Sequence, residues 1–183
     1  MLRMIDFVLS FVGIVLLSPL LLAIWTIGFL LIQKPIFKQT RLGRNKKPFV
    51  LYKFRTMRLE TPSVATHLVD GSSIFPFGKV LRKTKLDELP QLFNVLRGDM
   101  SLVGPRPNLS NQKILIDARE ALDIYSHRPG ITGLAQLQNV DMSTPNRLAK
   151  LDRQMLDNIS LKNYTKYIIM TVLGNGQGDG VKK

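Results

Sequence analysis

The chain lacks cysteine altogether and is poor in acidic residues. The absence of cysteine excludes disulfide bonds, thiolate chemistry and cysteine-ligated metal sites, and it is compatible with a reducing compartment. Acidic residues number 13 against 26 lysines and arginines, which gives a formal net charge of +13. This excess of positive charge requires anionic partners, namely nucleic acid, phospholipid headgroups or phosphorylated substrates. Composition does not choose among the three.

Charge of either sign is missing from one long stretch near the N-terminus, between Phe7 and Ile32. At about 1.5 Å per residue in a helix, this stretch can cross a hydrocarbon core of about 30 Å. It is too long for the core of a signal peptide and no convincing cleavage site follows it, so we expect it to be retained. The 183 residues therefore leave room for one membrane element and one domain with its own core.

Ser18 and Pro19 interrupt this apolar stretch near its middle. An interior proline removes a backbone hydrogen bond and clashes with the preceding turn, which costs about 3 kcal/mol in a straight helix. Two geometries are open: a kinked full span, or a re-entrant helix that enters and leaves by the same face. The charges favour the re-entrant form, because Arg3 lies on one flank and nine basic residues without an acidic one lie between Lys34 and Arg58. A re-entrant helix keeps both flanks beside anionic lipid on the cytoplasmic side.

An extended segment is expected after the apolar stretch. Residues 49–57 alternate in the manner of a half-buried strand, with Lys53 and Arg55 on one face. A turn-like composition at 43–48 precedes them, so a small β-hairpin is predicted. The basic face is either solvated or beside lipid headgroups, or one of its cations contacts a substrate phosphate. Residues 60–77 show little periodicity and are expected to form a loop.

Two adjacent carboxylates, Asp87 and Glu88, lie near the start of an amphipathic segment. Residues 84–98 have apolar side chains at helical spacing, an early proline and a final glycine, so they are expected to form a short helix. The carboxylates would then lie at its positively polarised N-terminal end. Acids at a helix start are also ordinary complements of the helix dipole, so the pair alone does not establish a site. The predicted apolar face comprises Leu89, Leu92, Phe93 and Leu96.

The sequence around these carboxylates closely resembles a family signature. Residues 87–107 read DELPQLFNVLRGDMSLVGPRP, which is similar to the signature of the bacterial sugar transferases, the monotopic phosphoglycosyl transferases. A second block, RPGITGLAQ at 128–136, resembles another motif of the same family in the expected order. The resemblance extends from the apolar stretch to about Ile169. Two long motifs in register make it highly specific.

The resemblance and the residue patterns together predict an α+β, mainly helical fold. Residues 1–34 would form the re-entrant membrane helix, since family members carry a Ser-Pro break there. Residues 35–170 would form a small catalytic domain with the hairpin and interfacial amphipathic helices, one of them around 164–170. Residues 171–183 would be a flexible tail. The expected location is the cytoplasmic face of the bacterial inner membrane, with both ends of the membrane helix cytoplasmic.

The resemblance implies an enzyme that moves a phosphosugar from a UDP-sugar to a polyprenol phosphate such as undecaprenyl phosphate. UMP would be released, and assembly of a surface glycoconjugate would begin. Asp87 would be the nucleophile that forms a covalent phosphosugar intermediate in a ping-pong mechanism, and it would also be a ligand of the Mg²⁺ cofactor. Glu88 would help to hold the metal or would accept a proton in the second half-reaction.

Three arginines and a further acid complete the predicted substrate-binding residues. Arg106 lies between two prolines, which fix its backbone and favour bidentate phosphate binding, although outside the signature this tripeptide would be an ordinary turn. Arg82 and Arg128 would also offset the repulsion between the carboxylates and a diphosphate. Asp152, on an expected helix over 146–160, matches an acidic position of the family. It would anchor an active-site arginine or a metal-bound water, and the alternative is a surface ion pair.

Two predictions concern packing. Residues 114–125 are expected to form an amphipathic helix whose apolar stripe, including Ile114, joins the core. Gly133, in the second motif, is expected to permit close approach of a ligand.

Some alternatives remain open. Residues 137–143 replace an Asn-Gly-Arg-Asn sequence of many relatives, which leaves the specificity for sugar and base undecided. One rival is a membrane-tethered basic module that binds anionic lipid or nucleic acid without catalysis. Another is an enzyme of the same fold that handles a non-acetylated hexose phosphate. For the enzyme, anionic membrane lipids are expected partners, nucleic acid is not, and the oligomeric state is undetermined.

Overall fold

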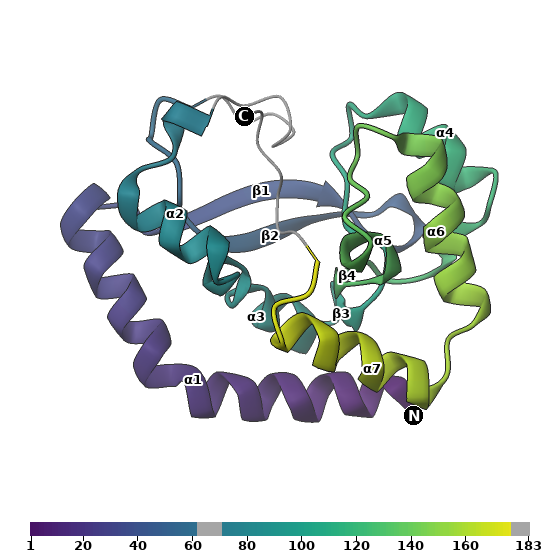
Figure 1. Ribbon diagram of the computed structural model, residues 1–183, viewed down its shortest axis with the longest axis horizontal. Coiled ribbons are helices and arrows are strands. Elements are labelled where there is room, and N and C mark those ends of the chain that lie inside the picture. The colour runs from purple at the N-terminus through teal and green to yellow at the C-terminus, as the bar shows by residue number, and fades with distance from the viewer. Residues whose placement is uncertain (62–70, 177–183) are drawn as a thin grey trace.

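The computed structural model describes residues 1–61 and 71–176, and its architecture is α+β and mainly helical, as predicted (Figure 1). The predicted loop and tail fall partly outside the described residues, at 62–70 and 177–183. The helices and strands are α1 (Leu2–Ile32), β1 (Ile36–Leu42), β2 (Pro48–Phe54), α2 (Pro76–Lys83), α3 (Gln91–Arg97), β3 (Ser101–Val103), α4 (Lys113–Glu120), β4 (Gly130–Thr132), α5 (Leu134–Leu137), α6 (Pro145–Asp157) and α7 (Leu161–Val172). Short 3₁₀ turns are η1 (Arg44–Lys46), η3 (Gly71–Ser73), η4 (Leu86–Glu88) and η5 (Ile124–Ser126).

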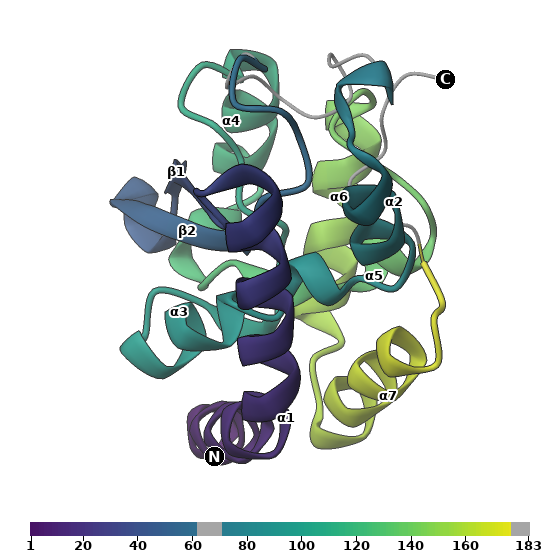
Figure 2. The same cartoon turned by 90° about the vertical axis from the view of Figure 1, so that its left-hand side faces the viewer.

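The N-terminal helix α1 is continuous and bends near its middle, so that it follows two sides of the molecule (Figures 1 and 2). Pro19 lies inside the helix and has no N–H to donate to the carbonyl of Val15. The Ser18 hydroxyl donates to this same carbonyl at 2.8 Å and so satisfies it. The predicted Ser-Pro break is therefore a bend in an unbroken helix, and the re-entrant path through a membrane stays a prediction.

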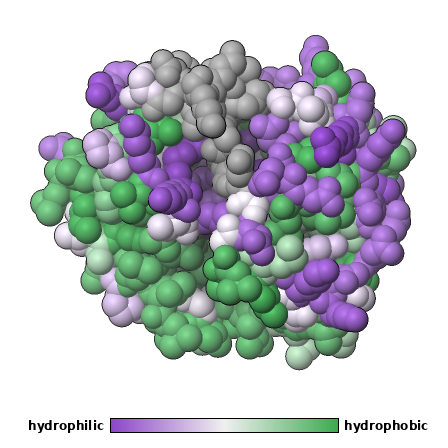
Figure 3. All heavy atoms as spheres, in the orientation of Figure 1, coloured by the Kyte–Doolittle hydropathy of each residue, from purple (hydrophilic) through white to green (hydrophobic). Residues whose placement is uncertain are grey.

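Most of the surface of α1 is apolar and exposed. Among the described residues, α1 is the one helix long and apolar enough to cross a membrane. Figure 3 shows the apolar surface along the lower and left edges, where α1 lies. This surface supports association with a membrane. Both halves of the helix also pack on the domain, through the buried residues Asp6, Ser10, Ile24 and Gly28.

The predicted hairpin is confirmed. Strands β1 and β2 are antiparallel, with Ile36 opposite Phe54, and η1 lies in the turn between them. Helix α3 docks on β2 through Asn94, a fully buried amide. The Asn94 side chain donates to the Val50 carbonyl at 2.7 Å and accepts from the Tyr52 N–H at 3.1 Å. One side chain thus satisfies two backbone groups of the strand.

The predicted single helix over 84–98 is wrong, because the segment is divided. Lys85 adopts a left-handed conformation with φ 57°, the 3₁₀ turn η4 follows it, and α3 begins only at Gln91. Asp87 and Glu88 therefore lie in a 3₁₀ turn that precedes the α-helix. The separate turn allows the two carboxylates to approach β2 while α3 runs along α1.

The predicted apolar face of this segment is also wrong in part. Gln91 and Asn94 are buried, whereas Phe93 is 45% exposed. The reason is that α3 meets β2 with the amide of Asn94 and meets α1 with Leu92. A Cβ added to Gly13 of α1 would lie 3.4 Å from Leu92.

A second, two-stranded sheet joins distant parts of the chain. Strands β3 and β4 are parallel, with Ser101 opposite Gly130, and the sequence did not predict this pairing. A Cβ at Gly130 would lie 2.0 Å from the Gly104 nitrogen, so the two backbones can approach only because residue 130 is glycine. A Cβ at Gly133 would lie 2.7 Å from the Gly104 carbonyl oxygen. The close approach at Gly133 is therefore made by the chain's own backbone, and the approach of a ligand there stays a prediction.

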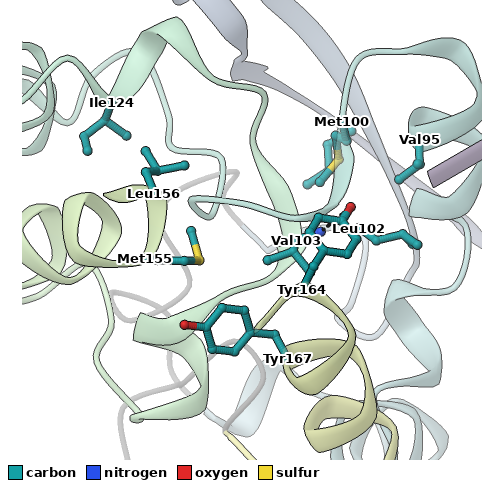
Figure 4. Close-up of a cluster of buried hydrophobic side chains, with 10 residues drawn as sticks. Val95, Met100, Leu102, Val103, Ile124, Met155, Leu156, Tyr164 and Tyr167 are labelled. Atoms are coloured by element: carbon teal, nitrogen blue, oxygen red, sulfur yellow. Dashed lines mark hydrogen bonds between the residues drawn. The ribbon is translucent and has the colours of Figure 1, made fainter. Parts of the chain in front are cut away.

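The main core lies between this sheet, α3, α6 and α7 (Figure 4). Helices over 113–120 and 145–157 confirm two predicted helical segments. The stripe predicted for the first was wrong at Ile114, which is 68% exposed. Helix α4 instead packs on α6 with Leu115 and Arg119 buried. The core side chains are Leu51, Val95, Met100, Leu102, Val103, Ile124, Met155, Leu156, Tyr164 and Tyr167.

Candidate active site

Three charged side chains from separate elements meet at the turn η4. Glu88 Oε1 accepts a hydrogen bond from Arg106 Nη2 at 2.5 Å and another from Lys53 Nζ at 3.0 Å. Glu88 and Lys53 are buried, and the Arg106 side chain is mostly so. Hydrogen bonds between ionised partners are about twice as strong as neutral ones, and burial protects them from screening by salt. The carboxylate of Glu88 thus holds two cations beside Asp87, which is itself buried.

The position of Lys53 corrects the prediction for the basic face of the hairpin. Lys53 is neither solvated nor exposed to lipid, because the face of β2 that bears it packs against η4. In an alternating strand the Lys53 side chain and those of its two aromatic neighbours lie on opposite faces. Here both neighbouring positions are also at least partly buried, so neither face of the strand is open. A buried ammonium requires a partner, and Glu88 supplies it.

Arg106 is fixed at its backbone carbonyl as well as at its guanidinium. The Arg119 guanidinium donates through Nη1 to the Arg106 carbonyl at 2.8 Å and to Asn108 Oδ1 at 3.0 Å. The same guanidinium binds Asp152 Oδ2 through Nη2 at 2.7 Å and through Nε at 3.0 Å. Asp152 is only 1% exposed, so the alternative of a surface ion pair is wrong. Asp152 acts on the Arg106 backbone through Arg119, and its predicted contact with substrate stays a prediction.

Two pKa shifts reflect this environment. Burial raises the pKa of the Asp152 carboxyl, and the charge and hydrogen bonds of Arg119 oppose that shift. Burial lowers the pKa of the Lys85 ammonium, while Glu88 raises it and Arg106 lowers it. Lys85 therefore belongs to the positive surroundings of Glu88.

The arrangement fits Mg²⁺ only together with a substrate. Within residues 1–61 and 71–176, no three acidic, histidine or cysteine side chains are grouped as metal ligands. Mg²⁺ in nucleotide-using enzymes is usually held by one or two carboxylates plus phosphate oxygens and water. Asp87, the predicted ligand, is a buried carboxylate of the turn η4 that would supply the protein oxygen, and its role as a metal ligand stays a prediction.

The other two predicted arginines make different contacts. Arg82 Nη1 donates to Thr56 Oγ1 at 3.4 Å. Its helix α2 approaches the same residue closely, since a Cβ at Gly78 would lie 2.3 Å from the Thr56 carbonyl oxygen. Arg128 Nε donates to the Gly98 carbonyl at 2.8 Å, at the opposite end of α3 from η4. The structure pairs Arg106 with Glu88 and uses Arg128 to fix the end of α3, so direct substrate contact by Arg82 and Arg128 stays a prediction.

The chain matches the bacterial sugar transferase family over residues 1–176. It belongs to this family. It is 43% identical over 136 residues to the uncharacterized sugar transferase EpsL of Bacillus subtilis. The aligned region covers 74% of the chain and 67% of EpsL. The chain is also 46% identical over 109 residues to a UDP-glucose:undecaprenyl-phosphate glucose-1-phosphate transferase of Caulobacter vibrioides, which covers 57% of the chain and 41% of that protein.

A third relative aligns over almost the whole chain. The undecaprenyl-phosphate galactose phosphotransferase of Salmonella typhimurium is 34% identical over 192 residues, which covers 93% of the chain and 38% of that enzyme. The chain therefore spans less than half the length of two of these three relatives.

The sequence pattern does not identify Arg119, which lies in a segment predicted only to supply an apolar stripe. For Lys53 the pattern leaves open whether the side chain is solvated, beside lipid headgroups or in contact with a substrate phosphate. Arg119 had one usable signal, because it follows Leu115 by four residues and so lies on the same face of α4 as that buried leucine. A charged residue on the buried face of a helix predicts a buried partner, which here is Asp152.

Proposed function

We propose that the chain transfers a sugar 1-phosphate from a UDP-sugar to undecaprenyl phosphate and releases UMP, as the first membrane step of glycoconjugate assembly. The names of the Caulobacter and Salmonella relatives support this class of reaction. The observation that carries the proposal is the buried Glu88 carboxylate with Lys53 and Arg106, next to Asp87. A carboxylate that must approach an anionic diphosphate requires such cations beside it.

The proposed chemistry has two displacements at one phosphorus. In the first, a carboxylate oxygen of Asp87 attacks the phosphorus that bears the sugar, and the bond from that phosphorus to the UMP oxygen breaks. In the second, a phosphate oxygen of the polyprenol phosphate attacks the same phosphorus, and the bond to Asp87 breaks. The carboxylate is regenerated, and the products are UMP and a polyprenyl diphosphate sugar.

The remaining residues orient the phosphates and balance their charge. Arg106, fixed by its prolines and by Arg119, would bind the diphosphate, and Lys53 would add a second positive charge. Asp87 and the diphosphate oxygens would hold Mg²⁺, which when bound would neutralise the leaving UMP. Glu88 binds two cations, so we assign it to positioning Arg106 and Lys53 in preference to proton transfer.

UMP release tests this proposal. Without polyprenol phosphate, the wild-type protein should release about one UMP per active molecule and then stop, and a sugar phosphate should remain on the protein. Asp87→Asn keeps the size of the side chain but is a poor nucleophile, so it should abolish this single turnover. Asp117→Asn, at an exposed acid of α4, is the matched control and should behave as wild type.

Other outcomes would support other mechanisms. UMP release that begins only when the lipid acceptor is added would indicate a direct displacement, with the carboxylates as metal ligands. No release under either condition would favour a binding module. A panel of UDP-sugars would also show whether the sugar is N-acetylated, since the relatives are named for glucose, galactose and N-acetylgalactosamine.

We further propose that α1 is re-entrant, with both ends on the cytoplasmic side beside anionic lipid. Contacts of both halves of α1 with one domain support this topology. The cysteine-free chain allows a direct test with single cysteines at Leu2 and Thr40. Both should react with a membrane-impermeant thiol reagent from the same side of oriented vesicles. Reaction from opposite sides would establish a full span.

A further inference from the structure

A buried carboxylate of α1 lies outside the site and binds two other elements of the domain. Asp6 Oδ1 accepts hydrogen bonds from the Leu102 N–H at 2.9 Å and from the Tyr164 hydroxyl, and Asp6 Oδ2 accepts one from the Ser101 hydroxyl at 2.9 Å. The Ser101 and Tyr164 oxygens are themselves 2.9 Å apart. We name Asp6, Ser101, Leu102 and Tyr164 the Asp6 cluster. It joins the membrane helix α1 to β3 and to α7.

The cluster is well satisfied in spite of its burial. Asp6 is 3% exposed, and both of its oxygens have donors. Burial raises the pKa of the Tyr164 hydroxyl and the hydrogen bond to Asp6 raises it further, so the phenol remains a proton donor at physiological pH. A carboxylate with several donors in a low-dielectric site fixes the elements that supply them.

The half of α1 that contains Asp6 also contacts both segments that lead to the site. Strand β3 continues within four residues from Leu102 to Arg106, whose guanidinium binds Glu88. Arg3 donates to the carbonyl of Met100 and to that of Leu96, each at 3.3 Å, and so ties the first turn of α1 to the end of α3 and the start of β3. The catalytic turn and the Arg106 segment are thus both fixed relative to the membrane helix.

We propose that Asp6, Ser101 and Tyr164 are positioning residues that set the height of the active site relative to the membrane, and so control its access to the lipid acceptor. This inference rests on the proposed function. The UDP-sugar reaches the site from water, whereas the acceptor phosphate is confined to the membrane surface. A site that is correctly built but wrongly placed would therefore keep the first displacement and lose the second.

Tyr164→Phe tests the inference, because it removes one hydroxyl and leaves the ring in the core. The matched control is Tyr167→Phe, one turn later in α7, whose hydroxyl points away from that of Tyr164 and takes no part in the Asp6 cluster (Figure 4). Two quantities are measured in vesicles: the acceptor-free burst of UMP and the KM for polyprenol phosphate. Asp6→Asn, which keeps the shape of the side chain but places an amide donor among donors, serves as a second variant.

For Tyr164→Phe we expect a UMP burst within about twofold of wild type and a KM for polyprenol phosphate raised about tenfold, the order of effect of one buried hydrogen bond to a charged group. Asp6→Asn should shift KM in the same direction, and Tyr167→Phe should change neither quantity. An equal loss of burst and turnover in Tyr164→Phe, or no change in KM, would overturn the inference and leave the cluster purely structural.

A second readout does not depend on activity. Trp25 is the single tryptophan of the chain and is partly exposed on α1, so its quenching by brominated lipids reports the depth of this helix. Tyr164→Phe should change the depth profile, and Tyr167→Phe should not. If wild type releases no UMP, the proposed function fails. In that case an unchanged depth profile would also overturn the positioning role, whereas a changed one would support it.

Discussion

Asp152 and Asp6 are both almost completely buried, yet the protein stabilises their charges in opposite ways. Asp152 depends on one cation, Arg119, and uses one oxygen; its Oδ1 has no hydrogen-bond partner among the described residues. Asp6 receives neutral donors on both oxygens, and its nearest cation, Arg3, is 3.8 Å away. The first arrangement concentrates the stabilisation in one contact, and the second distributes it over several.

The difference follows from what each carboxylate has to hold. Asp152 orients a single guanidinium, which in turn fixes the backbone of Arg106. Asp6 joins α1 to two other elements, and receives two donors from β3 and one from α7. Loss of one partner should therefore be severe at Asp152 and graded at Asp6.

Replacement of Arg119 should have the largest effect. Arg119→Met leaves Asp152 buried without its cation, and breaking a buried ion pair in this way typically lowers the free energy of unfolding by about 3–5 kcal/mol. Urea denaturation in detergent micelles measures the change. Arg153→Met is the matched control, because Arg153 pairs with Asp157 on the exposed face of α6 and its loss should be hardly measurable.

A double variant sharpens the interpretation. Arg119→Met with Asp152→Leu removes both charges, so most of the lost stability should return. Activity should not return, because the Arg106 carbonyl has still lost its donor. If Arg119→Met alone is as stable as wild type, the concentrated arrangement described for Asp152 is wrong.

The distinction between local patterns and distant partners explains what could be predicted from the sequence. Local patterns identified the apolar N-terminal helix and the hairpin, because periodicity and turn composition are properties of neighbouring residues. The family motifs pointed to Glu88 and Arg106, and these two side chains form an ion pair. The partners Lys53 and Arg119 come from other elements, and their pairing depends on tertiary packing that no local pattern encodes.

Packing also explains the errors in the helix over 84–98. A helix with leucines at regular spacing predicts a leucine-lined core face, but α3 lies between β2 and α1. Its buried side toward the strand is therefore an amide, Asn94, which satisfies two backbone groups. No local pattern predicts the role of Asp6, for a related reason. Asp6 precedes the apolar stretch, and its donors lie about a hundred residues or more further along the chain.

Removal of one donor from Asp6 should have a smaller effect than loss of Arg119. Ser101→Ala removes a hydroxyl but leaves Leu102 and Tyr164 bonded to the carboxylate, so the free energy of unfolding should fall by about 1 kcal/mol. The same denaturation experiment measures it. Ser126→Ala is the control, since that hydroxyl is bonded to the Asp123 carbonyl in an exposed turn. A loss as large as that of Arg119→Met would show that the stabilisation at Asp6 is not distributed.

The smallest effect is expected at His127, where a titratable group lies among like charges and has no buried partner of opposite sign to hold it. Burial lowers the pKa of the imidazole below its ordinary value of about 6.5, and Arg153 and Arg44 lower it further while Asp123 opposes them. The folded protein then binds fewer protons at His127 than the unfolded chain does. The contribution of His127 to stability is therefore present above about pH 6.5, and it is lost as the pH falls through that value toward the lowered pKa. The effect is small because His127 is only partly buried, so solvent screens the charges around it. Denaturation of wild type and His127→Gln between pH 7.5 and 5.5 should show that wild type loses slightly more stability than the variant. A larger loss in the variant would mean that the Asp123 carboxylate sets the protonation of His127, and that burial and the two arginines do not.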